Sequence, residues 1–191
     1  RVRDRRRTHR GNPALVTTAA ILRTVSTSLV TTPDGAGVLA GAVLMATHFE
    51  RFAQVADRPR EFGAPRSDKV NRPLGNVLLV CAPGCDSVTV GENLAAALAA
   101  GNRVAVSLPG VPDQLMRLLF ELLYGCFAME RFCVLTEACG WTISGADLSI
   151  VVLTPSRAYL NERPWITQAQ SPGLLTSSTD LLRFYGAAQG D

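Results

Sequence analysis

Two cysteines that lie four residues apart, Cys81 and Cys85, are the first candidates for chemistry in this sequence. A metal site built on them would need further nitrogen or sulfur ligands. The two histidines, His9 and His48, are far from them along the chain, so we predict no metal site. The five cysteines form an odd set, which favours thiols in a reducing compartment over a disulfide framework.

Positive charge is concentrated at the start of the chain. The first ten residues hold six arginines and one aspartate, a sum of +5, whereas the whole chain has a net charge of +3, which leaves −2 for the rest. The body is therefore not a basic nucleic-acid-binding domain. We predict that residues 1–12 form a solvated basic arm, with contact to nucleic acid or to an acidic membrane surface as the alternative.

Composition also gives expectations about location. The longest apolar run, Ala36 to Ala46, is shorter than the about 20 residues that span a bilayer, so we predict no membrane span. An intracellular, cytoplasmic protein is expected. Residues 1–32 are rich in Arg, Ser and Thr and poor in acids, which makes a mitochondrial transit segment the alternative.

Strand-like and helix-like segments alternate through most of the sequence. Apolar residues at three- and four-residue spacing predict helices, and short continuous apolar runs predict buried strands. The expected helices are 13–31, 37–56, 88–100, 113–124 and 180–185, and the expected strands are 76–81, 103–108, 132–135 and 148–153. The first of these strands reads as buried on both faces. Residues 57–73 read as a linker.

Two helix starts and one helix face can also be predicted. Ser87 or Asp86 is expected to cap one helix, and Asp113 is expected to cap the next. The residues expected to face inward from that second helix are Leu115, Leu118, Leu119, Leu122 and Leu123.

Alternating strands and helices favour a parallel α/β sheet. Such sheets bind ligands at the carboxyl ends of their strands, which here are the loops 83–87, 107–110 and 154–156. No G-x-G-x-x-G follows any predicted strand, so the common dinucleotide fingerprint is absent.

Three stretches carry a family resemblance. They read RPLGNVLLVCAP over residues 72–83, NLAAALAAGNRVAV over residues 93–106 and GADLSIVVLTPS over residues 145–156. Together they resemble the aldehyde dehydrogenase superfamily, in which a strand ending in Pro leads through a helix to ALAAGN and a second strand. Gamma-glutamyl phosphate reductases and acyl-CoA reductases share this superfamily, and residues 87–90 are similar to the former.

The resemblance covers residues 13–156 and is strongest over 72–106. It implies an α/β fold with a Rossmann-like open parallel sheet flanked by helices and preceded by two N-terminal helices. Residues 13–156 would form this nucleotide-binding domain, and residues 157–191 would form a C-terminal extension.

The resemblance also implies a site for NAD or NADP. The positions that match its cofactor loops are Pro83, Gly84, Ser107, Pro109, Thr154 and Ser156. All three loops depart from the family pattern. Asp86 and its neighbours replace the family's Trp-Asn-Phe-Pro, Ser107 replaces a ribose-binding Lys, and Pro155 replaces a Gly, which removes a backbone N–H.

No catalytic residue is assigned. The family's nucleophilic Cys and general-base Glu lie beyond the matched segments, and none of the five cysteines stands in the family's catalytic motif. We therefore expect a pseudoenzyme domain, non-catalytic alone, that assembles with a protein partner or as a homo-oligomer. The alternative is the NAD(P)-binding portion of an aldehyde, acyl or glutamyl-phosphate-type oxidoreductase.

Overall fold

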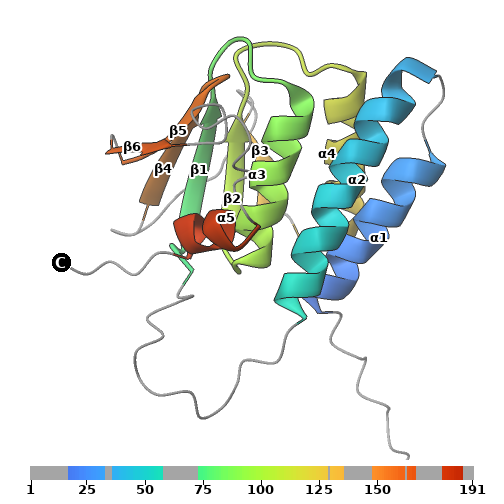
Figure 1. Ribbon diagram of the computed structural model, residues 1–191, viewed down its shortest axis with the longest axis horizontal. Helices are drawn as coiled ribbons and strands as arrows, with labels where there is room; N and C mark the ends of the chain where they lie inside the picture. The colour runs from blue at the N-terminus through green and yellow to red at the C-terminus, as the bar shows by residue number, and fades with distance from the viewer. Residues whose placement is uncertain are drawn as a thin grey trace, which may run out of the picture.

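The computed structural model describes residues 17–32, 36–57, 73–128, 130–135, 148–161, 163–166 and 178–186. These residues form a mixed α/β structure, with a mostly parallel sheet beside layers of helices (Figure 1). The predicted basic arm and nearly all of the predicted linker lie outside the described residues.

The sheet has six strands in the order β3-β2-β1-β4-β5-β6. Its parallel part is formed by β1 (Asn76–Cys81), β2 (Arg103–Ser107), β3 (Phe132–Val134) and β4 (Leu148–Leu153). The bounds of β1 and β4 are those that the sequence predicts, and β2 and β3 each end one residue earlier.

The prediction of an open, wholly parallel sheet is wrong at one edge. There β5 (Arg157–Leu160) pairs antiparallel with β4, and β6 (Arg163–Ile166) pairs antiparallel with β5. Only a few residues separate these strands, and a parallel connection needs a crossover of a dozen residues or more. Asn161, with φ 47°, forms the turn after β5 and accepts a hydrogen bond from the backbone N–H of Ile150 at 2.8 Å.

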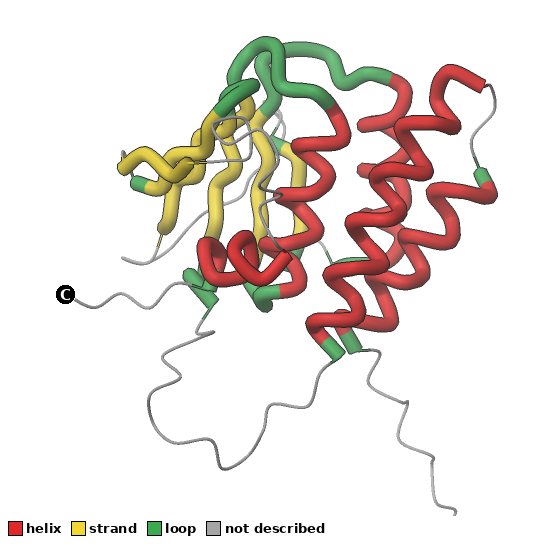
Figure 2. Tube along the Cα trace, in the orientation of Figure 1, coloured by secondary structure: helices red, strands yellow, loops and turns green. Residues whose placement is uncertain are grey.

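All the described helices lie on one face of the sheet (Figures 1 and 2). The two that precede the sheet, as predicted, are α1 (Thr18–Thr31) and α2 (Ala36–Ala56). They pack side by side and cover α3 (Ser87–Ala99) and α4 (Gln114–Cys126), and α5 (Ser178–Tyr185) packs against α3.

Aspartates begin the two helices that follow sheet strands. The side chain of Asp86 accepts a hydrogen bond from the backbone N–H of Thr89 at 2.8 Å, so Asp86 and not Ser87 is the cap of α3. Asp113 accepts from the backbone N–H of Met116 at 2.8 Å and caps α4, as predicted. Each bond satisfies one of the N–H groups that a helix start leaves without a partner.

The hydrophobic core lies between the sheet and the helices. Alternate residues of β1 are buried in it, whereas Leu78 and Val80, on the other face, are only half-buried. The prediction that this strand is buried on both faces is therefore wrong, because every described helix packs on the same face of the sheet. In α4 the buried residues are Met116, Leu119, Phe120 and Leu123, so two of the five predicted inward leucines belong to the buried set.

A buried polar group holds the last described helix in place. Tyr185 is fully buried, and its hydroxyl donates a hydrogen bond of 2.8 Å to Oδ1 of Asn93 on α3. The backbone N–H of Leu74, before β1, donates to the main-chain oxygen of Tyr185. The short helix predicted at residues 180–185 is thus confirmed, and it closes the lower end of the core in Figure 1.

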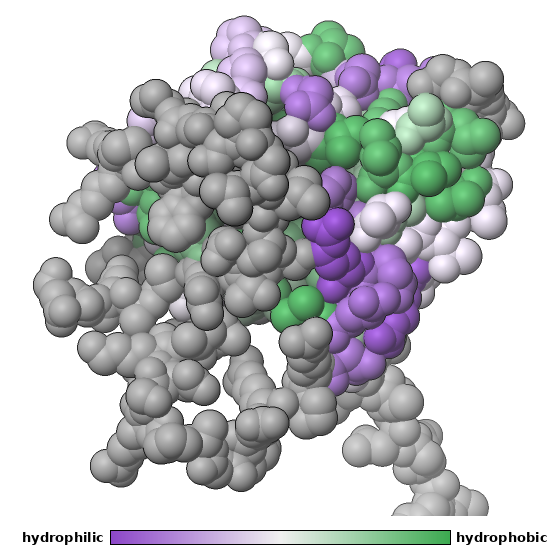
Figure 3. All heavy atoms as spheres, viewed as in Figure 1, coloured by the Kyte–Doolittle hydropathy of each residue, from purple (hydrophilic) through white to green (hydrophobic). Residues whose placement is uncertain are grey.

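The outer surface of α1 and α2 carries exposed apolar side chains. Val30, Leu39 and Val43 are each more than 40% exposed, and Leu44 is 57% exposed. We call these four residues the α1–α2 apolar patch. Figure 3 shows hydrophobic atoms gathered on this part of the molecule.

Candidate functional site

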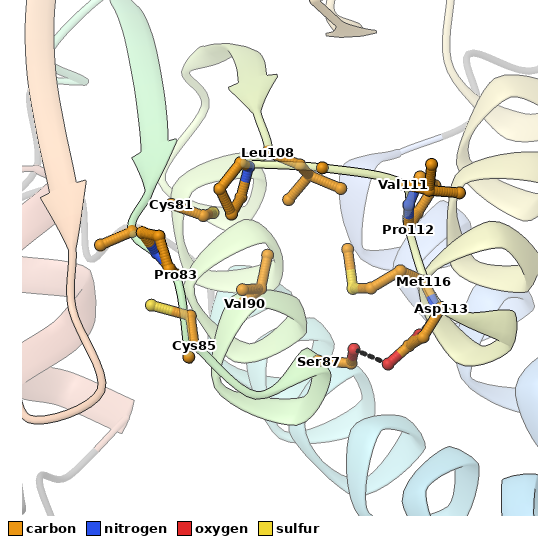
Figure 4. A pocket seen from close by; sticks show the side chains of 14 residues that line it. Cys81, Pro83, Cys85, Ser87, Val90, Leu108, Val111, Pro112, Asp113 and Met116 are labelled. Carbon is orange, nitrogen blue, oxygen red and sulfur yellow. Dashed lines mark hydrogen bonds between the residues drawn. The ribbon is translucent and has the colours of Figure 1, made fainter.

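A cavity of about 370 Å³ opens between the carboxyl ends of β1 and β2 (Figure 4). Its walls come from the loop and first turn of helix after β1, residues 81–90, and from the corresponding segment after β2, residues 108–116. Most of the lining side chains are apolar: Pro83, Val90, Leu108, Pro109, Val111, Pro112 and Met116. This is the edge at which a parallel sheet is expected to bind ligands.

The polar part of the cavity wall joins the starts of two helices. Oγ of Ser87, on α3, donates a hydrogen bond of 2.5 Å to Oδ2 of Asp113, the cap of α4 (Figure 4). Asp86, the cap of α3, precedes Ser87 directly and also accepts from the hydroxyl of Thr89 at 2.5 Å. Two carboxylates therefore stand where the positive ends of two helix dipoles would otherwise attract an anion.

The structure brings together three of the six residues that the family resemblance implies for cofactor binding. Pro83, Gly84 and Pro109 line the cavity. Ser107 is half-buried at the end of β2 and does not line it. The other two, Thr154 and Ser156, follow β4 on the opposite side of β1 and are also outside the lining.

Strand alternation explains why Ser107 is outside the cavity. Val104 and Val106 of β2 belong to the core on the helix side of the sheet, so Ser107 lies on the other face. The cavity opens on the helix side, and Leu108 reaches it. The same rule puts Thr154 on the face opposite to Leu153, which belongs to the helix-side core.

The loops after β1 and β4 are in close contact. Gly84 has φ +86°, and a Cβ placed there would lie 3.3 Å from Cγ of Pro155. The main-chain oxygen of Leu153 accepts from the backbone N–H of Ala82 at 2.8 Å and from Sγ of Cys85 at 3.2 Å. Because the sheet order reverses direction between β1 and β4, this contact lies at the position where open α/β sheets bind their ligands.

The cysteines at the cavity are held as neutral thiols. Burial, and then the nearby Cys85, raise the pKa of Cys81 from 9.0 to about 12. Burial also raises the pKa of Cys85, and Asp86 adds to that rise, against the effect of a hydrogen bond with the backbone of Ala82. A nucleophilic cysteine acts as the thiolate, so neither thiol is prepared for covalent catalysis at neutral pH.

Models of known protein families were compared with the chain. None matches, and no curated protein matches it either. In the part of the chain that the structure describes, no three His, Cys, Asp or Glu residues are grouped so that they could hold a metal ion. None of the helices in that same part is long and apolar enough to cross a membrane.

Sequence reasoning missed several residues that shape the cavity. Asp113 was predicted only as a helix cap. Because α3 and α4 are neighbours, it also accepts the hydrogen bond from Ser87 at the cavity. Val90 and Met116, which fall within the predicted helices 88–100 and 113–124, were not expected to reach a site, yet both line the cavity. The available signal was their position in the first turn of a helix that follows a strand, where side chains reach the carboxyl edge of the sheet.

Proposed function

We propose that this chain is a non-catalytic, aldehyde-dehydrogenase-like domain that works by assembling with another protein molecule. Its strand order β3-β2-β1-β4, with the helices α3 and α4 between successive strands, corresponds to half of a Rossmann fold. That order supports the Rossmann-like architecture that the sequence resemblance implies. It does not bear on activity, because one fold serves many functions.

The geometry of the three loops favours a role without a dinucleotide. Asp86 and Asp113 occupy the helix starts with negative charge, and among the described residues that line the cavity there is no Lys, Arg or His. Pro155 packs against Gly84, and Leu153 holds the loop after β1 through two hydrogen bonds. A cofactor with a pyrophosphate would meet the two aspartate carboxylates at the helix starts, and none of the described lining residues would supply a positive charge to pair with it.

The α1–α2 apolar patch is the observation that carries the proposal. It combines four exposed apolar side chains on two adjacent helices, Val30 with Leu39, Val43 and Leu44. Residues 24–47 contain only one charged side chain, Asp34, so the patch offers a partner almost no charge to pair with. Contiguous exposed apolar surface on a globular protein marks an interaction site. A second copy of the chain has the same uncharged surface, and a homodimer is the assembly to test first.

Sedimentation velocity of the full chain, from micromolar to about 100 µM, tests this function. We expect a species larger than the monomer, and we expect Leu44→Glu to convert it to a monomer that stays folded, with the circular dichroism spectrum of the wild type and a melting temperature that no longer depends on protein concentration. Val111→Glu is the matched control, because Val111 is 90% exposed but lies at the cavity. A wild-type chain that stays monomeric over this range would overturn the proposed assembly.

The same samples test the alternative function. A thermal-shift titration with NAD and NADP up to millimolar concentration should leave the melting temperature unchanged. Saturable stabilisation by either cofactor would instead support an NAD(P)-binding domain of an oxidoreductase.

A further inference from the structure

From the cavity between the carboxyl ends of β1 and β2, we infer a binding site for a small, uncharged, mainly apolar molecule that carries an N–H or O–H donor. The inference goes beyond the assembly role and does not depend on it, because the cavity and the α1–α2 apolar patch are formed by different residues. The inferred ligand also differs from the dinucleotide that the family resemblance implies.

The size and walls of the cavity suit a small organic molecule. Ligand sites commonly occupy about 300–1,000 Å³ and are lined by apolar side chains with a few polar groups, and this cavity measures about 370 Å³. Val90 and Met116 are buried at its inner side, on α3 and α4. Leu108, Pro109 and Pro112 add further apolar surface between them. A planar or compact apolar body would replace water against these side chains.

Charge at the cavity excludes an anion. Of the lining residues in the described part of the chain, only Asp113 is charged, and Asp86 lies next to the lining residues Cys85 and Ser87. The N–H groups of Thr89 and Met116, in the first turns of α3 and α4, already donate to these two carboxylates. A phosphate or carboxylate would meet the negative charge of Asp86 and Asp113 at these helix starts.

The hydrogen bonds of the polar wall show what the ligand must supply. The hydroxyl of Ser87 uses its proton in the bond to Asp113, which leaves its oxygen as an acceptor. The carboxylate of Asp113 accepts two hydrogen bonds, and a carboxylate has about four sites for them. These two side chains therefore offer acceptors, and the ligand has to donate.

Binding of two molecules that differ only in charge tests the inference. We would titrate the full chain with indole-3-carboxamide and, separately, with indole-3-carboxylate, and follow binding by ligand-observed NMR and by isothermal titration calorimetry. We expect saturable binding of the amide and at least tenfold weaker binding of the carboxylate. No saturable binding of the amide at millimolar concentration, or equal binding of the two, would overturn the inference.

Two glycines offer a matched pair of blocking variants. Gly110 lines the cavity and Gly125 lies in the last turn of α4, and an added Cβ has no heavy atom within 4 Å at either position. Gly110→Phe should weaken binding of the amide at least tenfold, and Gly125→Phe should leave it within twofold. Equal effects of the two variants would place the ligand elsewhere and contradict the inference.

The role of Asp113 needs a variant that keeps the helix cap. Asn is as good a cap as Asp, so Asp113→Asn should retain the melting temperature while removing the negative charge. The preference for the amide over the carboxylate should then fall from at least tenfold to less than threefold. An unchanged preference in the folded variant would show that Asp113 does not select the ligand, against the inference.

Discussion

Nδ2 of Asn102 donates a hydrogen bond of 2.9 Å to the main-chain oxygen of Tyr185, which lies 83 residues later in the sequence. The same nitrogen donates to the main-chain oxygen of Ala97 at 3.1 Å, and Oδ1 accepts from the backbone N–H of Gly75 at 3.0 Å. One buried carboxamide thus joins the end of α3, the start of β1 and the end of α5. The Gly-Asn pair that carries part of the family resemblance has a structural role here.

Removal of this carboxamide should destabilise the fold. Asn102→Ala removes one hydrogen bond from each of three main-chain groups and leaves the N–H of Gly75 without its partner, and we expect the free energy of unfolding to fall by about 2–4 kcal/mol. Urea denaturation measures this change. Gln54→Ala is the control, because the amide of Gln54 is exposed and donates to the exposed side chain of Glu50, and it should cost less than about 0.5 kcal/mol. Equal losses for the two variants would contradict the structural role of Asn102.

Two tyrosine hydroxyls allow a comparison of buried and exposed hydrogen bonds. Tyr185→Phe removes the buried donor to Asn93 and should cost about 1–2 kcal/mol of unfolding free energy. The hydroxyl of Tyr124 accepts from the backbone N–H of Val134 at 2.8 Å, but this side chain is 42% exposed, so water can replace it. Tyr124→Phe should therefore cost less than Tyr185→Phe in the same assay, and the reverse order would refute the prediction.

Burial of Cys81 should make stability depend on pH in the alkaline range. Its pKa is about 12 in the folded chain against 9.0 for an ordinary thiol, so the unfolded chain loses this proton first as the pH rises. The contribution of this buried neutral thiol to the free energy of unfolding is then fully present below pH 9. It is lost between pH 9 and 12, and the free energy of unfolding falls there with a slope approaching about 1.4 kcal/mol per pH unit.

Urea denaturation between pH 8.5 and 10 measures this effect. In Cys81→Ala the free energy of unfolding should fall less steeply with rising pH than in the wild-type chain. Cys126→Ala should reduce this slope less, because Cys126 is less buried, although burial raises its pKa too. Parallel pH profiles for the wild type and Cys81→Ala would show that this thiol is not protected from ionisation.

Close packing of α2 against α3 requires a glycine. A Cβ at Gly91 would lie 2.8 Å from Cε and 2.9 Å from Cγ of the fully buried Met45. Alanine gains about 1 kcal/mol of helix propensity, but overpacking costs about 1–3 kcal/mol. Gly91→Ala alone should thus destabilise the fold by about 1 kcal/mol.

The effect of Gly91→Ala on stability should change from unfavourable to favourable when Met45 is shortened. In a Met45→Ala chain the clash is absent, and adding Gly91→Ala should stabilise the protein by about 0.5–1 kcal/mol through helix propensity. A thermal-denaturation double-mutant cycle measures this coupling. Additive effects of the two substitutions would mean that the two side chains do not compete for space.

Local sequence signals were sufficient for much of the parallel part of the fold. β1 and β4 are mainly apolar, and each runs into a segment with Pro, so their bounds follow from the sequence. Asp113 follows a Pro-rich turn and precedes a helical pattern, which identifies it as a cap.

The antiparallel edge could not be found in the same way. β5 and β6 have four residues each, and Pro164 within β6 argues against a strand in isolation. An edge strand tolerates Pro, because one of its sides has no strand to bond to, and only the tertiary arrangement shows that β6 is at the edge. The buried face of α4 was predicted in part. Leu119 and Leu123 are buried and the other three predicted leucines pack partly buried against the core, whereas the burial of Met116 and Phe120 depends on contacts that no local pattern contains.

The position of the candidate site could be predicted from the sequence, but the side-chain contacts within it could not. The carboxyl edge of the sheet follows from the alternation of elements, and Pro83, Gly84 and Pro109 line the cavity there. The contact between Ser87 and Asp113, 26 residues apart, depends on how α3 and α4 lie against each other. So does the contact of Gly84 with Pro155, which joins loops 71 residues apart in sequence.

The docking of α5 has a consequence for synthesis of the chain on the ribosome. Asn93 and Asn102 are translated long before Tyr185, which supplies a hydrogen-bonding partner to each of them. Until that segment leaves the ribosome exit tunnel, the core between α3 and β1 stays open, and water takes the place of Tyr185 at Oδ1 of Asn93 and at one N–H of Asn102. Completion of the fold is thus timed by the emergence of the helix 178–185, so a nascent chain paused before it would be the form most exposed to chaperones and proteases.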